Sequence, residues 1–335
     1  MINMKDRDGR EPAIVMIAGN RTAGKTFWAK NFLVQKYLKT GRKFIVLQRF
    51  GYALTGMSDV FFKDLKEVKK QYFDMEMTEN VVVKNCINEL LLNGNPCGYC
   101  VALNNADSIK RNSTLFVDVD YIFLDEFQSE TGKYVPDEIQ KFISIYTSVA
   151  RGNGEQARFV KCILCSNNVS LLNPYYSSLG VAYLIQENTK FLRGTGWVLE
   201  LTFNENASEA QKNSAFGRAF EHENYMKFTT SSIYLNDSYT FVDKPHEDVW
   251  LSCVVEYKGI PYGVWVGHQF LYITTKYNKE CKFWYAIDVK EHGRDTLLLT
   301  KCSMKVKWWK ECFERGLFRF ENLACKEVMF ALLGY

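Results

Sequence analysis

The 335-residue sequence has no run of about 20 apolar residues, the length that a membrane-spanning helix needs, so we expect no membrane partner. Its first segment, Met1–Glu11, is polar and charged, and we expect no secretory signal peptide there. Internal repeats and low-complexity tracts are also absent. Neither charge is in large excess, because 42 basic and 38 acidic residues leave a net charge of +4. Any nucleic-acid-binding surface must therefore be local.

Ten cysteines are present, and without a secretion signal we expect reduced thiols in a cytoplasm. Two Cys-x-x-Cys pairs, Cys97/Cys100 and Cys162/Cys165, have a spacing used in zinc sites. The second pair lies in a predicted buried strand, where residues three apart point to opposite faces and cannot share a metal. The first pair follows an Asn93-Gly94 turn signal in a predicted hairpin. We therefore expect no zinc site.

The sequence does contain the pattern of an α/β protein. Ala13–Ala18 is a short apolar run rich in β-branched residues, Thr26–Leu38 has helical spacing, and Phe44–Leu47 is a second apolar run. Strand, helix and strand in this order predict a βαβ unit, and hence a parallel sheet. Further elements are expected at Tyr121–Leu124, Val160–Cys165 and Trp197–Phe203 (strands) and at Asp137–Ala150 (helix).

The pattern changes after residue 203, and the length suits about two domains. We predict an α/β domain over 1–203 with a mainly parallel sheet. Residues 204–234 are polar and weakly helical at first, which favours a linker subdomain. Residues 235–335 are rich in strands, with a hairpin signal at Lys258–Pro261 and helices near the end, which predicts a smaller α+β domain.

Gly19-Asn20-Arg21-Thr22-Ala23-Gly24-Lys25-Thr26 matches the phosphate-binding loop G-x-x-x-x-G-K-[ST] at every fixed position. Glycines let the backbone bend closely around phosphates, and the N–H groups at the start of the following helix attract the anion. Lys25 is expected to reach the β- and γ-phosphates of ATP, and the Thr26 hydroxyl to bind Mg²⁺. The loop follows a predicted strand and opens a predicted helix, which is the context that this motif requires.

An acidic pair, Asp125 and Glu126, follows the apolar residues Tyr121–Leu124. At the end of a strand about 100 residues after a phosphate loop, Asp125 is predicted to hold Mg²⁺ and Glu126 to activate the attacking water. An exposed acidic strand end is the alternative. The acids at Asp118 and Asp120 are more simply explained as a surface edge.

Polar residues also follow the predicted strand Val160–Cys165. Ser166 and Asn167 would lie at the carboxyl edge of the sheet, where nucleotide sites of α/β proteins form. They could sense the γ-phosphate or position water, or simply form a turn, and the residues alone leave both interpretations open.

Several cations are candidates for stabilising the triphosphate. Arg21 lies inside the loop and could reach the γ-phosphate of its own subunit. Arg151 precedes Gly152-Asn153-Gly154, and a cation on a glycine-flanked tip suits an arginine finger that acts on a neighbouring subunit. A solvated loop charge is the alternative for Arg151. Other cations that compete for this role are Lys110, Arg111 and Arg158.

These motifs resemble those of the DNA-packaging ATPases, or encapsidation proteins, of small podophages with protein-primed genomes. The resemblance rests on Gly19–Thr26, Phe123–Phe127 and Leu164–Asn167, and it extends over most of the chain. Further matching stretches are Asn173-Pro174-Tyr175, Phe216-Gly217-Arg218 and Tyr262-Gly263-Val264-Trp265-Val266. The first motifs occur in many ATPases, whereas the later ones in this order are more specific.

The resemblance implies a homo-oligomeric ring, expected to be a pentamer, at the portal of an empty prohead in the host cytoplasm. The ring would use ATP and Mg²⁺ to drive double-stranded DNA inward. In better-studied relatives the last domain meets the portal and a packaging RNA, and the sequence leaves open whether an RNA is used here. The implied fold is an additional-strand, terminase-like P-loop ATPase domain, a linker subdomain, and a domain resembling a degenerate RNase H-type nuclease.

The resemblance also assigns residues. Ser166 and Asn167 match the motif that couples hydrolysis to movement. Arg151, in Thr147–Arg151, matches a trans-acting finger, and Lys110, in Ser108–Asn112, matches a second trans-acting position.

The C-terminal strands offer the carboxylates Glu256 and Asp288 but no set suited to two metals, so we expect no nuclease activity. DNA would be bound mainly through its phosphates. Basic segments that could contact it lie in Phe61–Tyr72 and Lys305–Arg315. A solvated helix face is the favoured explanation of the first, and Trp308 and Trp309 of the second could instead belong to the core. The alternatives to a packaging motor are another P-loop motor, such as a helicase, and a nucleotide-dependent structural protein with little turnover.

Overall fold

The computed structural model describes residues 4–21, 23–151, 157–182, 184–185, 189–223, 226, 241–300 and 303–333. The chain divides into two compact units, one of Met1–Leu179 with Ile185–Asn236 and one of Gly180–Leu184 with Asp237–Tyr335. Thr22 of the phosphate loop, the glycine-flanked tip after Arg151, and residues 227–234 of the segment predicted as a linker lie outside the described residues. The division into three parts stays a prediction.

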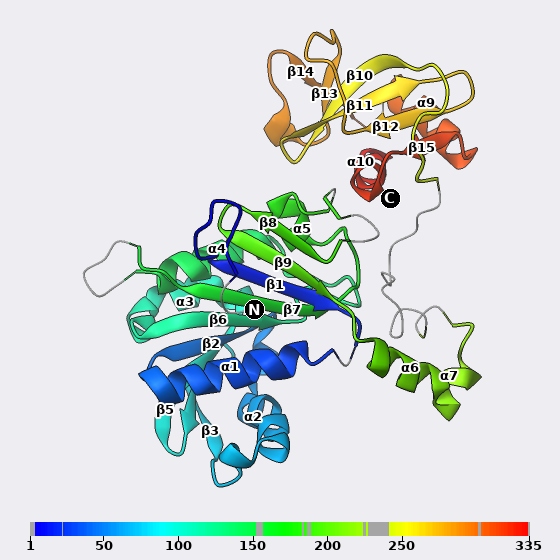
Figure 1. The fold of residues 1–335 in the computed structure, drawn as a ribbon. Coiled ribbons are helices and arrows are strands. Elements are labelled where there is room, and N and C mark those ends of the chain that lie inside the picture. The colour runs from blue at the N-terminus through cyan, green and yellow to red at the C-terminus, as the bar shows by residue number, and fades with distance from the viewer. Residues whose placement is uncertain are drawn as a thin grey trace. The chain divides into compact units, whose positions relative to one another are not determined.

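A nine-stranded sheet forms the centre of the first unit, in the order β3-β4-β5-β2-β6-β7-β1-β9-β8 (Figure 1). The neighbouring strands β5-β2-β6-β7-β1-β9 pair in parallel. Antiparallel pairing is confined to the edges, where β3 pairs with β4, β4 with β5, and β8 with β9. The predicted, mainly parallel sheet is confirmed. The strands are β1 Ile14–Gly19, β2 Lys43–Gln48, β3 Met77–Val83, β4 Ile87–Leu92, β5 Asn95–Ala102, β6 Val119–Asp125, β7 Lys161–Asn167, β8 Phe191–Gly194 and β9 Trp197–Thr202.

Helices cover this sheet, and α1, which starts immediately after the phosphate loop, lies across it (Figure 1). The helices are α1 Lys25–Thr40, α2 Met57–Val68, α3 Ala106–Arg111, α4 Glu138–Val149, α5 Pro174–Leu179, α6 Glu205–Asn213 and α7 Ala215–Ala219. Apolar side chains of α1 and α2, such as Leu33 and Phe61, share one core with the sheet residues Ile17, Val46 and Phe123. Within the described part of the chain, no helix is both long and apolar enough to cross a bilayer.

One edge of the sheet gathers the predicted site. Because β1, β7 and β6 are parallel neighbours, their carboxyl ends meet at this edge. Gly19 pairs in register with Asn167, and Asp125 pairs with Cys165. The strand β7 therefore lies between the strand that leads into the phosphate loop and the strand that ends in the acidic pair. This inserted strand is the feature that the additional-strand prediction describes.

The Asn93-Gly94 turn joins β4 and β5 into an antiparallel hairpin, as predicted. Both residues have positive φ, 50° and 78°, which a tight hairpin turn of the primed type requires. Cys97 and Cys100 both lie in β5, and both are fully buried. Burial raises the pKa of Cys97 to about 12, so its thiol stays protonated and packs as a small apolar side chain.

In the described part of the second unit, a six-stranded sheet has the order β14-β13-β10-β11-β12-β15 and is accompanied by two α-helices. Strands β10 to β12 form an antiparallel meander, and β13 and β14 add in parallel on the side of β10. This order suits the RNase H-type fold that the resemblance implies. The elements are β10 Trp250–Tyr257, β11 Ile260–Val266, β12 Leu271–Thr274, β13 Trp284–Ala286, β14 Thr296–Leu298, β15 Phe318–Phe320, α9 Met304–Glu314 and α10 Leu323–Leu333.

Arg158 holds three parts of the first unit together just before β7. Its guanidinium donates hydrogen bonds to Asp120 Oδ1 at 2.9 Å, to Phe116 O at 2.8 Å and to Val149 O at 2.8 Å, and its side chain is almost fully buried. These contacts connect β6 with the end of α4. A guanidinium fixed in this way cannot reach a neighbouring subunit, so we no longer consider Arg158 a candidate for the trans-acting arginine finger.

We expect Arg158→Lys to lower the free energy of unfolding of the first unit by about 3 kcal/mol, because an ammonium cannot satisfy both carbonyls and the carboxylate of Asp120 at once. Urea unfolding of the full chain measures this loss. Arg42, which lies 3.6 Å from the other oxygen of Asp120 and is half-exposed, provides the control. Arg42→Ala should cost less than about 1 kcal/mol. Equal losses in the two variants would contradict the structural role of Arg158.

Candidate active site

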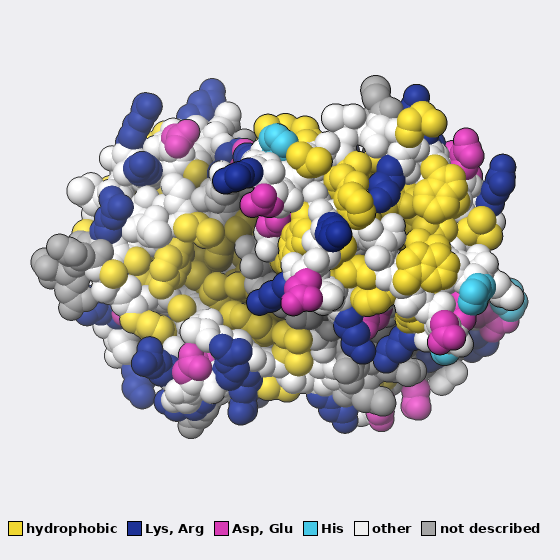
Figure 2. All heavy atoms as spheres, turned by 90° about the horizontal axis from the view of Figure 1, so that it is seen from above, with side chains coloured by type: hydrophobic (Ala, Val, Ile, Leu, Met, Phe, Trp, Pro, Cys, Tyr) yellow, Lys and Arg dark blue, Asp and Glu magenta, His cyan; other side chains and the backbone are white. Residues whose placement is uncertain are grey.

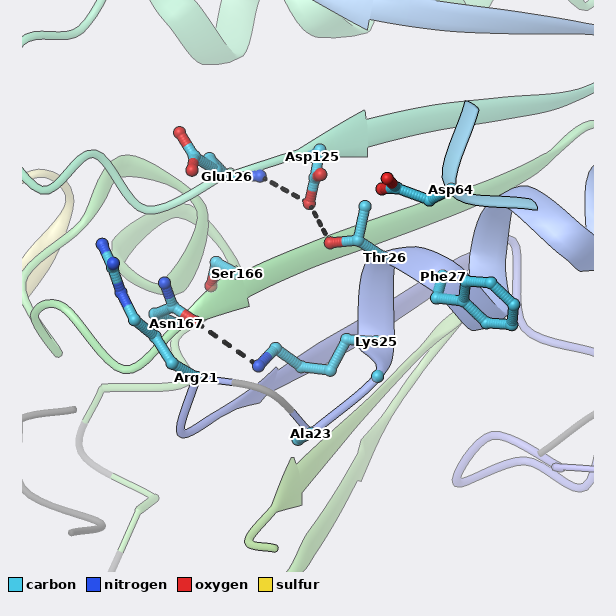
Figure 3. A pocket seen from close by; sticks show the side chains of 11 residues that line it. Arg21, Ala23, Lys25, Thr26, Phe27, Asp64, Asp125, Glu126, Ser166 and Asn167 are labelled. Carbon is cyan, nitrogen blue, oxygen red and sulfur yellow. Dashed lines mark hydrogen bonds between the residues drawn. The ribbon is translucent and has the colours of Figure 1, made fainter. Parts of the chain in front are cut away.

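A cavity of about 430 Å³ opens at the carboxyl edge of the sheet (Figure 3). Its walls come from the phosphate loop, the start of α1, α2 and the ends of β6 and β7. The lining residues are Arg21, Ala23, Gly24, Lys25, Thr26, Phe27, Asp64, Asp125, Glu126, Ser166 and Asn167. The fold therefore brings the predicted loop, acidic pair and β7 residues into one cavity. Asp64 of α2 and Phe27 also line it, and no sequence motif pointed to them.

The phosphate loop bends sharply before α1. Gly24 has a φ of +74°, a left-handed conformation that side chains disfavour, and it occupies the N-cap position of α1. Gly19 is closed to any side chain, because a Cβ there would lie 2.1 Å from Thr202 O. The two glycines of the motif are thus required for different reasons. Gly24 adopts a backbone conformation that side chains disfavour, and Gly19 packs too closely for a Cβ.

Lys25 lies inside the loop, with its side chain almost fully buried. Its Nζ donates to Asn20 O at 2.7 Å, to Gly19 O at 3.3 Å and to Asn167 Oδ1 at 3.5 Å. Burial lowers the pKa of Lys25 to about 8, and the negative charge at Asp125 only partly offsets this effect. The ammonium is therefore available to bind phosphate, and it is held by neutral carbonyls that a phosphate oxygen can replace.

The acidic pair is arranged for two different tasks. Asp125 Oδ1 accepts hydrogen bonds from Thr26 Oγ1 at 2.9 Å and from the Glu126 N–H at 3.1 Å. Burial raises the pKa of Asp125, so a bound cation would favour its charged form. The carboxylate and the adjacent hydroxyl are the hard oxygen donors that suit Mg²⁺. The residues present therefore fit the ion that the sequence predicts at Thr26 and Asp125.

Glu126 has a left-handed backbone with a φ of 55°, which turns the chain sharply after β6. Burial raises the pKa of its carboxyl group, and the negative charges of Asp125 and Glu130 add to this effect. A raised pKa makes a carboxylate a stronger base, provided that it remains ionised at the working pH. Figure 3 shows that Glu126 and Arg21 lie on the same side of the cavity.

Glu130, which sequence analysis did not single out, connects two predicted residues. It accepts from Arg21 Nη2 at 2.8 Å and from Asn167 Nδ2 at 3.2 Å. Asn167 in turn contacts Lys25 through its Oδ1 atom. The loop arginine and the β7 asparagine are thus positioned by one carboxylate. The Ser166 hydroxyl is buried with no hydrogen-bond partner among the described residues, so it is available to a ligand in the cavity.

Arg49, which follows β2, fixes the backbone around Glu126 and was also missed. Its guanidinium donates to Glu126 O at 2.6 Å and to Phe127 O at 2.7 Å, and it forms an ion pair with the buried Glu138. Glu138 also accepts from Tyr175 Oη at 2.9 Å. These contacts hold the turn after β6 in its left-handed conformation. No local pattern joins segments so far apart in the sequence.

The two predicted trans-acting cations lie outside this cavity. Lys110 is exposed on α3, and Arg151 is exposed just after α4. Neither belongs to the described residues that line the cavity of the same chain. Their roles stay predictions.

Comparison with known proteins identifies the family. The sequence matches the family described as Podovirus DNA encapsidation protein (Gp16) over residues 3–334, nearly its whole length. The chain belongs to this family. The resemblance deduced from the motifs is thereby confirmed.

DNA packaging proteins of Bacillus phages are similar to the chain along most of its length. It is 25% identical over 322 residues to a DNA packaging protein of Bacillus phage phi29, covering 94% of this chain and 92% of the relative. It is 24% identical over 322 residues to the corresponding protein of Bacillus phage PZA, with the same coverage. Its structure is similar to a chain of the bacteriophage Phi-29 viral genome packaging motor assembly, with a TM-score of 0.72 and 23% identity over 96% of this chain and 95% of that one. This likeness supports the α/β fold.

We expect the affinity of this protein for a nucleotide to fall as the pH rises above about 8. Phosphate binds the protonated Lys25, whose pKa is lowered to about 8 in the free protein, so binding at higher pH requires proton uptake. The dissociation constant should rise by up to about tenfold per pH unit. Calorimetric titration with a non-hydrolysable ATP analogue between pH 7 and pH 9.5 measures it.

The matched control is Lys25→Arg, because a guanidinium stays charged over this range. This variant should bind the analogue with an affinity that does not change between pH 7 and pH 9.5. An unaltered protein whose affinity is also constant over this range would contradict the lowered pKa of Lys25.

Proposed function

We propose that the protein hydrolyses ATP to drive double-stranded DNA into a preformed prohead. The observation that supports this most is one cavity, lined by Lys25, Thr26, Asp125 and Glu126, in a chain that matches the encapsidation family over residues 3–334. DNA packaging is also the named function of the phi29 and PZA relatives. ATP hydrolysis supplies the free energy that confining DNA requires.

Each residue of the cavity has a role in this proposal. Lys25 binds the β- and γ-phosphates, and the loop N–H groups at the start of α1 add partial positive charge. Thr26 and Asp125 would hold Mg²⁺, which neutralises developing phosphate charge. Glu126 orients the attacking water and accepts its proton. Ser166 and Asn167 contact the terminal phosphate from β7, and these contacts are lost when the phosphate is released.

Assembly into a ring is part of the proposal. A homo-oligomer, expected to be a pentamer, would bind the portal of the prohead in the host cytoplasm, with a packaging RNA as a further candidate partner. Arg151 and Lys110 would then act on the nucleotide of a neighbouring subunit, which suits their exposure outside their own cavity. Arg21, paired with Glu130, would act within its own subunit.

DNA contact would use exposed basic side chains. In and just after α2, the exposed lysines are Lys63, Lys66, Lys69 and Lys70. In α9 the two adjacent tryptophans differ, because Trp309 is fully buried and Trp308 is 46% exposed. Figure 2 shows apolar side chains interspersed with Lys and Arg on the surface. Trp308 with Lys307 and Lys310 is therefore a candidate nucleic-acid contact, whereas Trp309 belongs to the core.

We expect the second unit to have no nuclease activity. Its candidate carboxylates are Glu256 on β10 and Asp288, and Asp288 accepts a hydrogen bond from the Lys290 N–H. Among the described residues, no group of three or more His, Cys, Asp or Glu side chains could hold a metal ion. A two-metal nuclease needs such a group.

Packaging of DNA into purified proheads with ATP tests the proposal directly. The expected result is DNA that becomes protected from added nuclease only when ATP is present. DNA-stimulated ATPase activity separates this function from a structural protein with little turnover. Separation of DNA strands without any packaging would instead favour a helicase.

We predict that Glu126→Gln retains ATP binding but lowers the turnover number by roughly 100-fold or more, because an amide cannot accept the proton of water. Filter binding of ATP and phosphate release measure the two properties. Asp64→Asn, which removes another carboxylate that lines the cavity, is the control for charge loss, and it should retain far more turnover. Near-normal hydrolysis by Glu126→Gln would remove Glu126 as the base.

We predict that Arg151→Ala subunits regain ATPase activity when they are mixed with Glu126→Gln subunits. In a mixed ring, an intact Glu126 cavity can face an intact Arg151 from the other variant. Lys84→Ala, which removes an exposed cation in the turn between β3 and β4, is the matched control and should be active without mixing. If assembled mixtures show no recovery at any ratio, Arg151 does not act in trans.

A further inference from the structure

Asn20, the second residue of the phosphate loop, directs its side chain to a distant segment of the first unit. Its Nδ2 donates to Asn204 O at 3.2 Å, and its Oδ1 accepts from the Asn204 N–H at 3.0 Å. Only 1% of its surface is exposed, and it is not among the residues that line the cavity. Both ends of the Asn20 amide are therefore paired with the backbone of one residue.

Asn204 is the residue on which α6 begins. Its side chain accepts from the Ala207 N–H at 3.1 Å, which caps the helix, and its carbonyl accepts from the Ser208 N–H at 3.1 Å. The same carbonyl accepts from Asn20. The first turn of α6 is thus fixed directly to the phosphate loop.

The opposite side of Asn20 contacts the phosphate-binding lysine. Lys25 Nζ donates to Asn20 O at 2.7 Å, the shortest hydrogen bond that this ammonium makes. Asn20 consequently connects two groups, the Lys25 ammonium through its backbone and the start of α6 through its side chain.

Close packing makes this connection stiff. Gly19 pairs with Thr202 at the end of β9, and a Cβ on Gly19 would lie only 2.1 Å from Thr202 O. The chain therefore passes from β9 into α6 in direct contact with the loop. In the sequence, α6 is the first helix after the sheet and precedes the main segment of the second unit, Asp237–Tyr335.

We propose that Asn20 is a positioning residue that couples nucleotide occupancy of the phosphate loop to α6. The inference rests on the proposed function, because it requires phosphate to bind Lys25. A phosphate draws the ammonium away from Asn20 O, the loop backbone adjusts, and the two hydrogen bonds of the Asn20 side chain transmit this adjustment to Asn204. The start of α6 then differs between the free and the nucleotide-bound protein.

Hydrogen exchange of the full-length chain tests this coupling. The amides of Ala207 and Ser208 report the first turn of α6, and they are compared with and without a non-hydrolysable ATP analogue and Mg²⁺. In the unaltered protein their exchange rates should change when the analogue binds. In Asn20→Ala this change should disappear, while the affinity for the analogue, measured in parallel, falls by no more than about tenfold, because the two lost hydrogen bonds join Asn20 to Asn204 and the Asn20 side chain does not line the cavity.

Two further variants separate coupling from stability. Asn204→Ala removes the cap of α6 but keeps the backbone groups that Asn20 binds, so exchange should be faster in both states and should still respond to the analogue. Asn20→Asp keeps the acceptor for the Asn204 N–H and loses the donor, so it should retain part of the response. This variant also serves as the test if Asn20→Ala does not fold.

Two results would overturn the inference. One is an unaltered protein that binds the analogue without any change in α6. The other is an Asn20→Ala variant with the full response. Failure of the unaltered protein to bind the analogue at all would show instead that the proposed function is wrong, and the inference would fall with it.

Discussion

The placement of one buried ammonium group determines much of the structure around it. Lys25 can be buried only because two carbonyls of the loop and the side chain of Asn167 accept hydrogen bonds from its ammonium group. These acceptors lie at the ends of two adjacent parallel strands, β1 and β7. Gly24, with its left-handed backbone, permits the bend that brings the ammonium to these acceptors. A sheet with another strand order at this edge would leave the ammonium with the two loop carbonyls and without the side-chain acceptor of Asn167.

The two carboxylates of the acidic pair, Asp125 and Glu126, differ in their contacts. Asp125 is bound by a hydroxyl and an N–H group, whereas Glu126 has its backbone fixed by Arg49 and its carboxyl group exposed to the repulsion of Asp125 and Glu130. One carboxylate is therefore prepared for a cation, and the other is made more basic. Two adjacent residues differ in chemistry because the contacts around them differ.

Local patterns in the sequence were enough to predict the strands and helices that carry the site, because buried strands and the phosphate loop have distinctive short-range signatures. Two of the hairpin turns were predictable, from Asn93-Gly94 and from Lys258–Pro261, because Asn and Gly readily adopt the positive φ found at Asn93, Gly94 and Gly259. Glu130, Asp64 and the Arg49–Glu138 pair were not predictable, since their partners lie on other elements. The difference in exposure between Trp308 and Trp309 was not predictable either, because it depends on which face of α9 packs against the sheet.

The insertion of β7 between β1 and β6 has a consequence for the wall of the cavity. Two strand spacings, about 9.5 Å, separate the strand that leads into the loop from the strand that ends in the acids. The end of β7 fills this space with two small polar side chains, Ser166 and Asn167, while Thr26 at the start of α1 reaches Asp125 directly at 2.9 Å. The strand order therefore gives the cavity a neutral polar wall between its cationic loop and its acidic edge.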